Sequence, residues 1–153
     1  MSVEQSERLL DQALQALNDR DWDSYGRVFA EALVTQAPGL PAPTKGRVAR
    51  VHWVQDIIQA FPDGRVEKKQ SFGQGDWLCA ELAFAGTHTG PLQGPSGSAV
   101  PATNRTVRFP YCLVLRLEGA EVTELHEYFD QLELLTQLGL MPGSSAADQA
   151  HAG

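Results

Sequence analysis

The stretch at residues 124–130 carries the side chains best suited to chemistry. It reads ELHEYFD, and in an extended strand residues two apart share a face. Glu124, His126, Tyr128 and Asp130 should therefore project together. A carboxylate and an imidazole, whose ordinary pKa is about 6.5, suit general acid–base catalysis near neutral pH. The pattern predicts a pocket wall that transfers protons, with Asp130 and His126 as the candidate catalytic residues.

Both candidates also have a structural interpretation. Asp130 is followed three residues later by Glu133, a spacing typical of a capping box at the start of a helix. His126 and Asp130 lie about 13 Å apart along a regular strand, at about 3.3 Å per residue. Glu124 is the nearer carboxylate, so the spacing favours a contact between Glu124 and His126. The alternative for His126 is a hydrogen-bonded histidine in the pocket wall.

Four other residues complete the predicted pocket. His88 continues the apolar row of residues 77–88 and should face the interior. Trp53 and Tyr25 either pack in the core or contact a ligand. Arg116 stands before a hairpin turn at 118–121, and its register pairs it with Thr123. That register predicts an outer-face or dimer-interface residue, with a role in the pocket as the alternative.

Apolar spacing predicts the elements that must position these residues. Helical spacing recurs in three stretches and near the C-terminus, at Leu9–Leu17, Trp22–Phe29, Val51–Phe61 and Leu132–Leu138. Alternating or apolar runs predict a short strand from Leu33 and strands at 77–88, 106–117 and 121–129. Segments 38–43 and 89–104, rich in Gly and Pro, are expected to be loops. Gly139 is placed to cap the last helix.

This order predicts an α+β fold, in which a curved antiparallel sheet wraps around the N-terminal helices as a cone. Such a cone leaves a cavity lined mostly by apolar side chains, where a small ligand would bind. The length of 153 residues fits one domain, at 1–141. The remaining residues, 142–153, lack core-forming side chains and are expected to be disordered.

Composition argues against several classes of function. The net charge is −7 and no cluster of Lys and Arg is present beyond Lys68 and Lys69, so nucleic acid is not an expected partner. No apolar run approaches the roughly 20 residues that span a bilayer, and the polar N-terminus does not resemble a signal peptide. We expect a cytoplasmic protein that does not associate with membranes.

The two cysteines and four histidines do not suggest a metal site. Cys79 and Cys112 each lie within an apolar run, where they are expected to be small buried hydrophobic residues rather than a disulfide. No Cys or His residues are grouped at the spacing of metal ligands. We therefore expect no metal site.

Several segments in this order resemble the SnoaL-like polyketide cyclases, within the nuclear transport factor two-like superfamily. They are the helix VARVHWVQDIIQAFPD, the strand end FAGTHTG, the strand entry PATNRTVRF, and the closing LRLEGAEVTELHEYFDQLELLTQLG. The resemblance covers about residues 25–139 and implies the cone fold. It also implies pairing into homodimers through the outer sheet face.

The resemblance implies a cofactor-independent cyclase or isomerase that acts on a polyketide-like or other apolar carbonyl compound. Asp130 matches the aspartate that is the family's general acid/base. Three features depart from the family pattern: His126 replaces a tryptophan, Arg116 replaces an assisting histidine, and the loop between Gly90 and Arg105 is longer. The alternatives are a non-catalytic protein that binds a small hydrophobic ligand, or an epoxide hydrolase or ketosteroid isomerase-like enzyme on the same fold.

Overall fold

The computed structural model describes residues 2–94 and 97–141. The expected disordered segment at 142–153 lies outside these residues. The helices are α1 (Val3–Asn18), α2 (Trp22–Arg27), α3 (Arg47–Ala60) and α4 (Gln131–Gln137). The strands are β1 (Phe29–Gln36), β2 (Thr44–Lys45), β3 (Arg65–Gln74), β4 (Trp77–Thr87), β5 (Leu92–Gln93), β6 (Ala99–Val100), β7 (Thr106–Glu118) and β8 (Glu121–Phe129).

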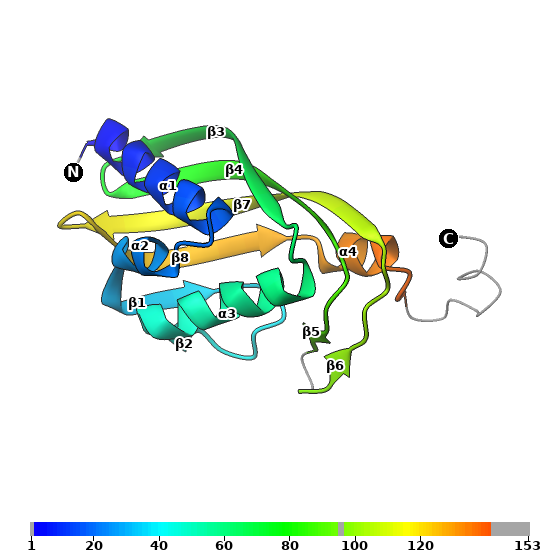
Figure 1. Cartoon of the computed structure of the whole chain (residues 1–153). Helices are drawn as coiled ribbons and strands as arrows, with labels where there is room; N and C mark the ends of the chain where they lie inside the picture. The colour runs from blue at the N-terminus through cyan, green and yellow to red at the C-terminus, as the bar shows by residue number, and fades with distance from the viewer. Residues whose placement is uncertain (1, 95–96, 142–153) are drawn as a thin grey trace.

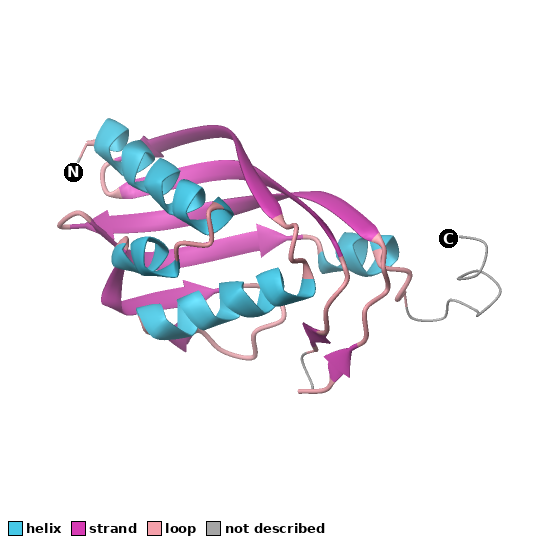
Figure 2. Ribbon diagram, viewed as in Figure 1, coloured by secondary structure: helices cyan, strands magenta, loops and turns pink. Residues whose placement is uncertain are grey.

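The main sheet is covered by helices on one face. Its six strands follow the order β2-β1-β8-β7-β4-β3. Figure 1 shows α1, α2 and α3 lying across this curved sheet, while α4 continues beyond the end of β8. The other face carries no helix in the described part of the chain (Figure 2). The expected α+β cone is confirmed, with one difference: β1 runs parallel to β8, so the sheet is mixed.

Local sequence explains where the helices begin and end. Ser2 and Gln5 form a reciprocal capping box at the start of α1. Asp130 caps α4, because its Oδ1 accepts a hydrogen bond from the backbone N–H of Glu133 at 3.1 Å. Gly139 follows α4 with φ of 71°, a conformation that favours glycine and fits the predicted C-terminal cap.

The inward side chains of the sheet form the core. Leu78, Ala80 and Leu82 of β4 are completely buried, as the alternating row predicts. They pack beneath the apolar stripe of α1 and belong to the same core cluster as Phe61, which follows α3. The predicted second helix is shorter than expected, because Phe29 begins β1 and packs edge-on against Tyr25 with ring centroids 5.0 Å apart.

The segment expected to be one long loop contains a short arm. β5 and β6 pair only with each other, through two residue pairs, as a separate sheet. In Figure 1 this arm lies beyond the C-terminal end of α3. The backbone N–H groups of Thr89 and Gly90 both donate to the carbonyl of Ala60, at 3.1 Å, and so fix the base of the arm to α3.

Candidate functional site

A largely apolar cavity lies between the helices and the concave face of the sheet. Its volume is about 90 Å³. Most of its wall comes from α3, β7 and β8, and Leu92 of β5 and Leu134 of α4 complete it. The lining residues are Leu17, Arg50, Trp53, Val54, Ile57, Ile58, Phe61, Val66, Phe84, Leu92, Phe109, Tyr111, Glu127, Phe129 and Leu134.

A buried ion pair supplies the charged groups of this wall. Arg50 of α3 donates through Nη1 to Oε2 of Glu127 on β8, at 3.0 Å, and both side chains are almost fully buried. Arg50 Nε also donates to the hydroxyl of Tyr25, at 3.2 Å. The guanidinium lies over the ring of Trp53, with Cζ 4.9 Å from the centroid. These contacts hold the two charges in one orientation at the cavity.

Two tyrosines beside the ion pair remain protonated. Burial raises the pKa of Tyr25, although Arg50 acts in the opposite direction. Burial also raises the pKa of Tyr111 well above 10, and the negative charge of Glu127 adds to this effect. Because Leu113 pairs with Glu127 and Tyr111 pairs with Phe129, Tyr111 lies diagonally next to Glu127 on the inward face. Tyr111 can therefore serve as a hydrogen-bond donor at the cavity.

Arg50 likewise keeps its proton and therefore its positive charge. Burial alone would lower the pKa of the guanidinium, but Tyr25 and Glu127 more than offset this effect and raise it. The described residues thus place a cation, a carboxylate partner and a phenol together at an otherwise apolar cavity. This combination can orient a polar group of a ligand and exchange a proton with it.

The residues predicted for the pocket wall on β8 face away from this cavity. Glu124, His126 and Tyr128 lie on the outer face of the sheet, whereas Leu125, Glu127 and Phe129 face inward. A β-bulge causes the difference. Arg116 pairs with Glu124 and Leu117 with Val122, so Thr123 is an extra residue in β8. Since one extra residue reverses the alternation, the predicted face is the wrong one for this cavity.

The same bulge changes the predicted register of Arg116. The pairing of Glu118 with Glu121 is as expected, but Arg116 lies opposite Glu124 rather than Thr123. Its side chain is on the outer face, where it forms an ion pair with Glu118 at 3.0 Å and lies over the ring of Trp77. Arg116 therefore does not line this cavity.

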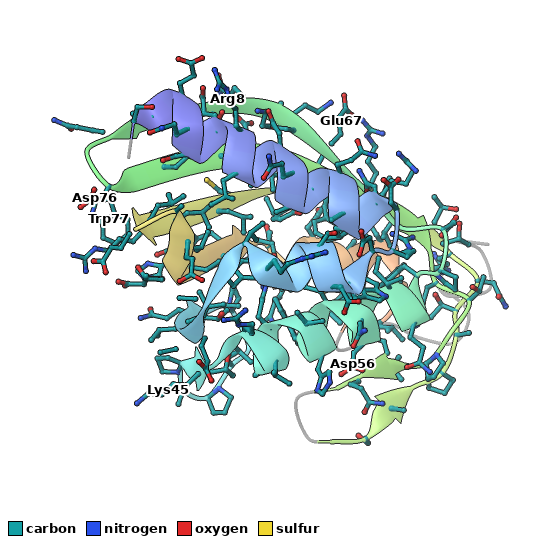
Figure 3. All side chains as sticks on the ribbon, turned by 60° about the vertical axis from the view of Figure 1, so that its left-hand side comes forward. Arg8, Lys45, Asp56, Glu67, Asp76 and Trp77 are labelled. Atoms are coloured by element: carbon teal, nitrogen blue, oxygen red, sulfur yellow. The ribbon has the colours of Figure 1, made fainter. Side chains whose placement is uncertain are left out.

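Several of the predicted residues lie close together on the outer face of the sheet. His126 Nε2 lies 2.7 Å from Oε1 of Glu124, the expected contact between these two residues. The ring of His126 packs edge-on against Trp77, with centroids 6.2 Å apart. Figure 3 shows Trp77 next to Asp76, at the turn between β3 and β4. Tyr128 is 55% exposed, so this cluster is a surface feature.

Asp130 occupies the end of β8, outside the cavity wall. It is exposed, and its carboxylate caps α4, as the capping interpretation predicts. It borders an open groove on the outer face together with Tyr128, Cys79 and Cys112. Asp130 and His126 project into different surroundings, and neither lines the inner cavity.

The two cysteines lie next to each other on the outer face. They are free and half-buried rather than fully buried, with their Sγ atoms 3.4 Å apart on β4 and β7. Burial, together with the contact with Cys79, raises the pKa of Cys112 to about 11. Its thiol is therefore a weak nucleophile near neutral pH.

His88 and the two aromatic candidates lie in different surroundings. Trp53 lines the cavity, and Tyr25 contacts it through Arg50. His88 is completely buried but does not line the cavity. Its Nδ1 accepts the backbone N–H of Thr103 at 3.2 Å and lies 3.0 Å from Oγ1 of Thr103. This contact joins the end of β4 to the segment that enters β7.

We expect His88 to make stability depend on pH. Burial lowers its pKa below the ordinary value of about 6.5. The unfolded chain therefore takes up a proton below about pH 6.5 that the folded chain binds less readily, so stability falls as the pH drops below this value. Urea unfolding should show a smaller loss between pH 7 and pH 5 in His88→Asn than in the wild type. An unchanged slope in His88→Asn would contradict this assignment.

Sequence reasoning missed the charged residues of the cavity, although two signals were present. Arg50 stands four residues before Val54 and eight before Ile58, within the apolar stripe of α3. Glu127 alternates with Leu125 and Phe129, both apolar. A charge of opposite sign in each of two apolar faces is the pattern expected of a buried ion pair.

Two further observations concern metals and membranes. Among residues 2–94 and 97–141, no group of three or more His, Cys, Asp or Glu side chains is arranged to hold a metal ion. Across the same residues, no helix combines the length and the apolar character needed to cross a bilayer.

The cone and its inner cavity define the class of protein. A curved sheet covered on its concave face by N-terminal helices is the nuclear transport factor two-like fold. The model of the SnoaL-like polyketide cyclases matches residues 7–138, and the chain belongs to this family. No curated protein matches the sequence at a significant level.

Solved structures share the fold at low sequence identity. TsrD from Streptomyces laurentii superposes with a TM-score of 0.79 at 20% identity, covering 92% of this chain and 99% of that one. AclR from Streptomyces galilaeus gives a TM-score of 0.78 at 20% identity, covering 99% of this chain and 91% of that one. An LEH-like epoxide hydrolase from M. tuberculosis gives a TM-score of 0.67 at 17% identity, covering 89% of this chain and 90% of that one. At these identities the likeness concerns the fold alone.

Proposed function

We propose that this protein binds a small, mostly apolar carbonyl compound in the inner cavity and transfers a proton at the carbon next to the carbonyl. The observation that carries the proposal is the Arg50–Glu127 ion pair at the wall of an otherwise apolar cavity. The SnoaL-like family assignment supports it, since the family is named for polyketide cyclases.

The residues can divide the reaction among themselves. The carboxylate of Glu127 would accept the proton from the carbon. The protonated phenol of Tyr111 would donate a hydrogen bond to the carbonyl oxygen, and the charge of Arg50 would stabilise the enolate that forms. Glu127 would then return the proton to carbon or to another acceptor position. Each step uses only groups of this chain.

Asp130 remains the rival acid/base, because the family resemblance implies that role. Two isosteric substitutions separate the candidates. Asparagine caps helices about as well as aspartate, so Asp130→Asn removes the charge and retains the start of α4. Glu127→Gln likewise removes a charge and retains an oxygen that can accept from Arg50. Each variant therefore removes one negative charge and keeps an oxygen that accepts a hydrogen bond, so the rates of the two variants can be compared directly.

Deuterium exchange provides the measurement. The wild type should accelerate incorporation of deuterium into the methyl group of acetophenone in D₂O, followed by proton NMR. Glu127→Gln should lower this rate by about 10²-fold or more, in the range of general acid–base contributions, while Asp130→Asn leaves it within about twofold. Loss of exchange in Asp130→Asn alone would move the role to Asp130.

A non-catalytic binding protein is the second candidate. It is favoured by the fact that Arg50 and Glu127 already satisfy each other without a ligand. Under this alternative acetophenone would bind saturably to the wild type and its exchange rate would equal that of the buffer. That result would contradict proton transfer and retain the ligand site.

We also propose a homodimer through the outer face, where Trp77, Tyr128 and Phe72 are exposed. Sedimentation would test it.

A further inference from the structure

We propose that the cavity selects an uncharged ligand with a single aromatic or conjugated ring and one hydrogen-bonding group. This inference rests on the proposed function, since it assigns a ligand class to the same cavity. Three properties of the cavity carry it: its charge balance, its aromatic wall and its volume.

The charge balance excludes an ionic ligand. Arg50 and Glu127 are buried and paired with each other, so their charges cancel at the cavity wall. An anion would compete with Glu127 for Arg50, and a cation would compete with Arg50 for Glu127. Either competition would leave one buried charge without its partner, which is costly in a low-dielectric interior. A neutral ketone or phenol can instead bond to the pair without displacing either charge.

The wall of the cavity favours a flat, unsaturated ring. Phe84 lies 5.5 Å from Phe61 and from Phe109, measured between ring centroids, and Phe109 lies 6.2 Å from Phe129. Trp53 closes the α3 side of the cavity. Aromatic rings attract one another at such distances, in tilted or edge-to-face geometry. A ligand ring would therefore join an existing aromatic cluster, and a saturated ring would lose these ring–ring contacts.

The volume limits the ligand to one ring. The cavity measures about 90 Å³, whereas pockets that enclose drug-sized ligands measure roughly 300–1,000 Å³. An engineered apolar cavity of about 150 Å³ in another protein holds benzene. Because this cavity is smaller than that one, even a single substituted ring requires side-chain adjustment, and it is the largest rigid group that we expect the cavity to admit. Fused ring systems would require the wall formed by Phe61, Phe84 and Phe109 to separate.

The polar groups occur together, which predicts one polar substituent. Arg50 contacts Glu127 directly, and Tyr111 lies diagonally next to Glu127 on the sheet. The remaining lining side chains are apolar apart from the indole of Trp53. A second polar group on the opposite side of the ring would be buried without a partner, and this cost would select against it.

Isothermal titration of the full chain with four matched compounds tests the inference. The compounds are acetophenone, benzoate, cyclohexyl methyl ketone and 2-acetylnaphthalene, which vary charge, unsaturation and ring number one at a time. Acetophenone should bind most tightly, and each of the others about tenfold more weakly or worse, a difference of about 1.4 kcal/mol per tenfold. Ile57→Phe, which fills the cavity from α3, should weaken acetophenone binding by a similar factor, while Val48→Ala, at an exposed residue of α3 that does not line the cavity, should not.

The outcomes separate the inference from the proposed function. Equal or tighter binding of benzoate or 2-acetylnaphthalene, weakened by Ile57→Phe, would overturn the ligand class and retain the ligand site. Equal binding by cyclohexyl methyl ketone would overturn the aromatic preference. If none of the four compounds binds, the cavity is not a site for small carbonyl compounds, and the proposed function fails with the inference.

Discussion

A Glu127→Leu variant is expected to unfold with a free energy about 3–5 kcal/mol below that of the wild type. The substitution leaves the guanidinium of Arg50 buried without its carboxylate partner, although it keeps the hydrogen bond to the hydroxyl of Tyr25. Urea unfolding followed by circular dichroism gives the free energy. Because a domain is typically stable by only 5–15 kcal/mol, this loss would be a large share of the total.

Two further variants show whether burial of the charge is the cause. The double variant Arg50→Met with Glu127→Leu removes both charges and should recover most of the loss. Glu118→Leu breaks the ion pair between Arg116 and Glu118, whose side chains are 43% and 51% exposed, and should cost only about 0–1 kcal/mol. A double variant as unstable as Glu127→Leu would show that the loss comes from packing rather than from the unpaired charge.

Phe61→Ala is expected to cost about 3–5 kcal/mol in the free energy of unfolding. Phe61 is 2% exposed, and its ring packs against Phe84 and His88 at centroid distances of 5.5 and 5.3 Å. Removing it leaves a void that the surrounding strands can fill only in part. Since the ring also lines the cavity, the variant should accept 2-acetylnaphthalene more readily than the wild type does. Urea unfolding and titration measure the two effects.

Val48→Ala provides the control. This valine is on α3 and is 63% exposed, so its substitution should change stability by no more than about 0.5 kcal/mol. Similar losses at Phe61 and Val48 would contradict the assignment of Phe61 to the core. If Phe61→Ala is too unstable to titrate, Phe61→Leu retains part of the packing and still enlarges the cavity.

Much of the fold follows from periodic patterns in the sequence. The stripes of α1 and α3, the alternating row of β4 and the turn at 118–121 each predict their element and the face it buries. The parallel pairing of β1 with β8 joins residues 90–93 positions apart in sequence, and no local pattern specifies it. The pairing depends on how the whole sheet closes around the helices.

The candidate site was harder to predict, because it depends on a single residue. Thr123 is not distinguished by composition, yet its bulge decides whether Glu124 or Glu127 faces the cavity. A polar face on β8 suggested a pocket, whereas the polar residues face outward and a lone carboxylate faces inward. Arg50 could have indicated this, since a buried cation on α3 requires an anion from the opposite wall.

The small arm formed by β5 and β6 has a consequence for kinetics. It pairs only with itself, and Leu92 at its edge forms part of the cavity wall. An isolated two-stranded ribbon is at best marginally stable, so this part of the wall should open far more often than the main sheet unfolds. A compound that enters only during such openings would associate at a rate that levels off as its concentration increases. Stopped-flow traces would then reveal how often the protein opens, independently of how tightly it holds what has entered.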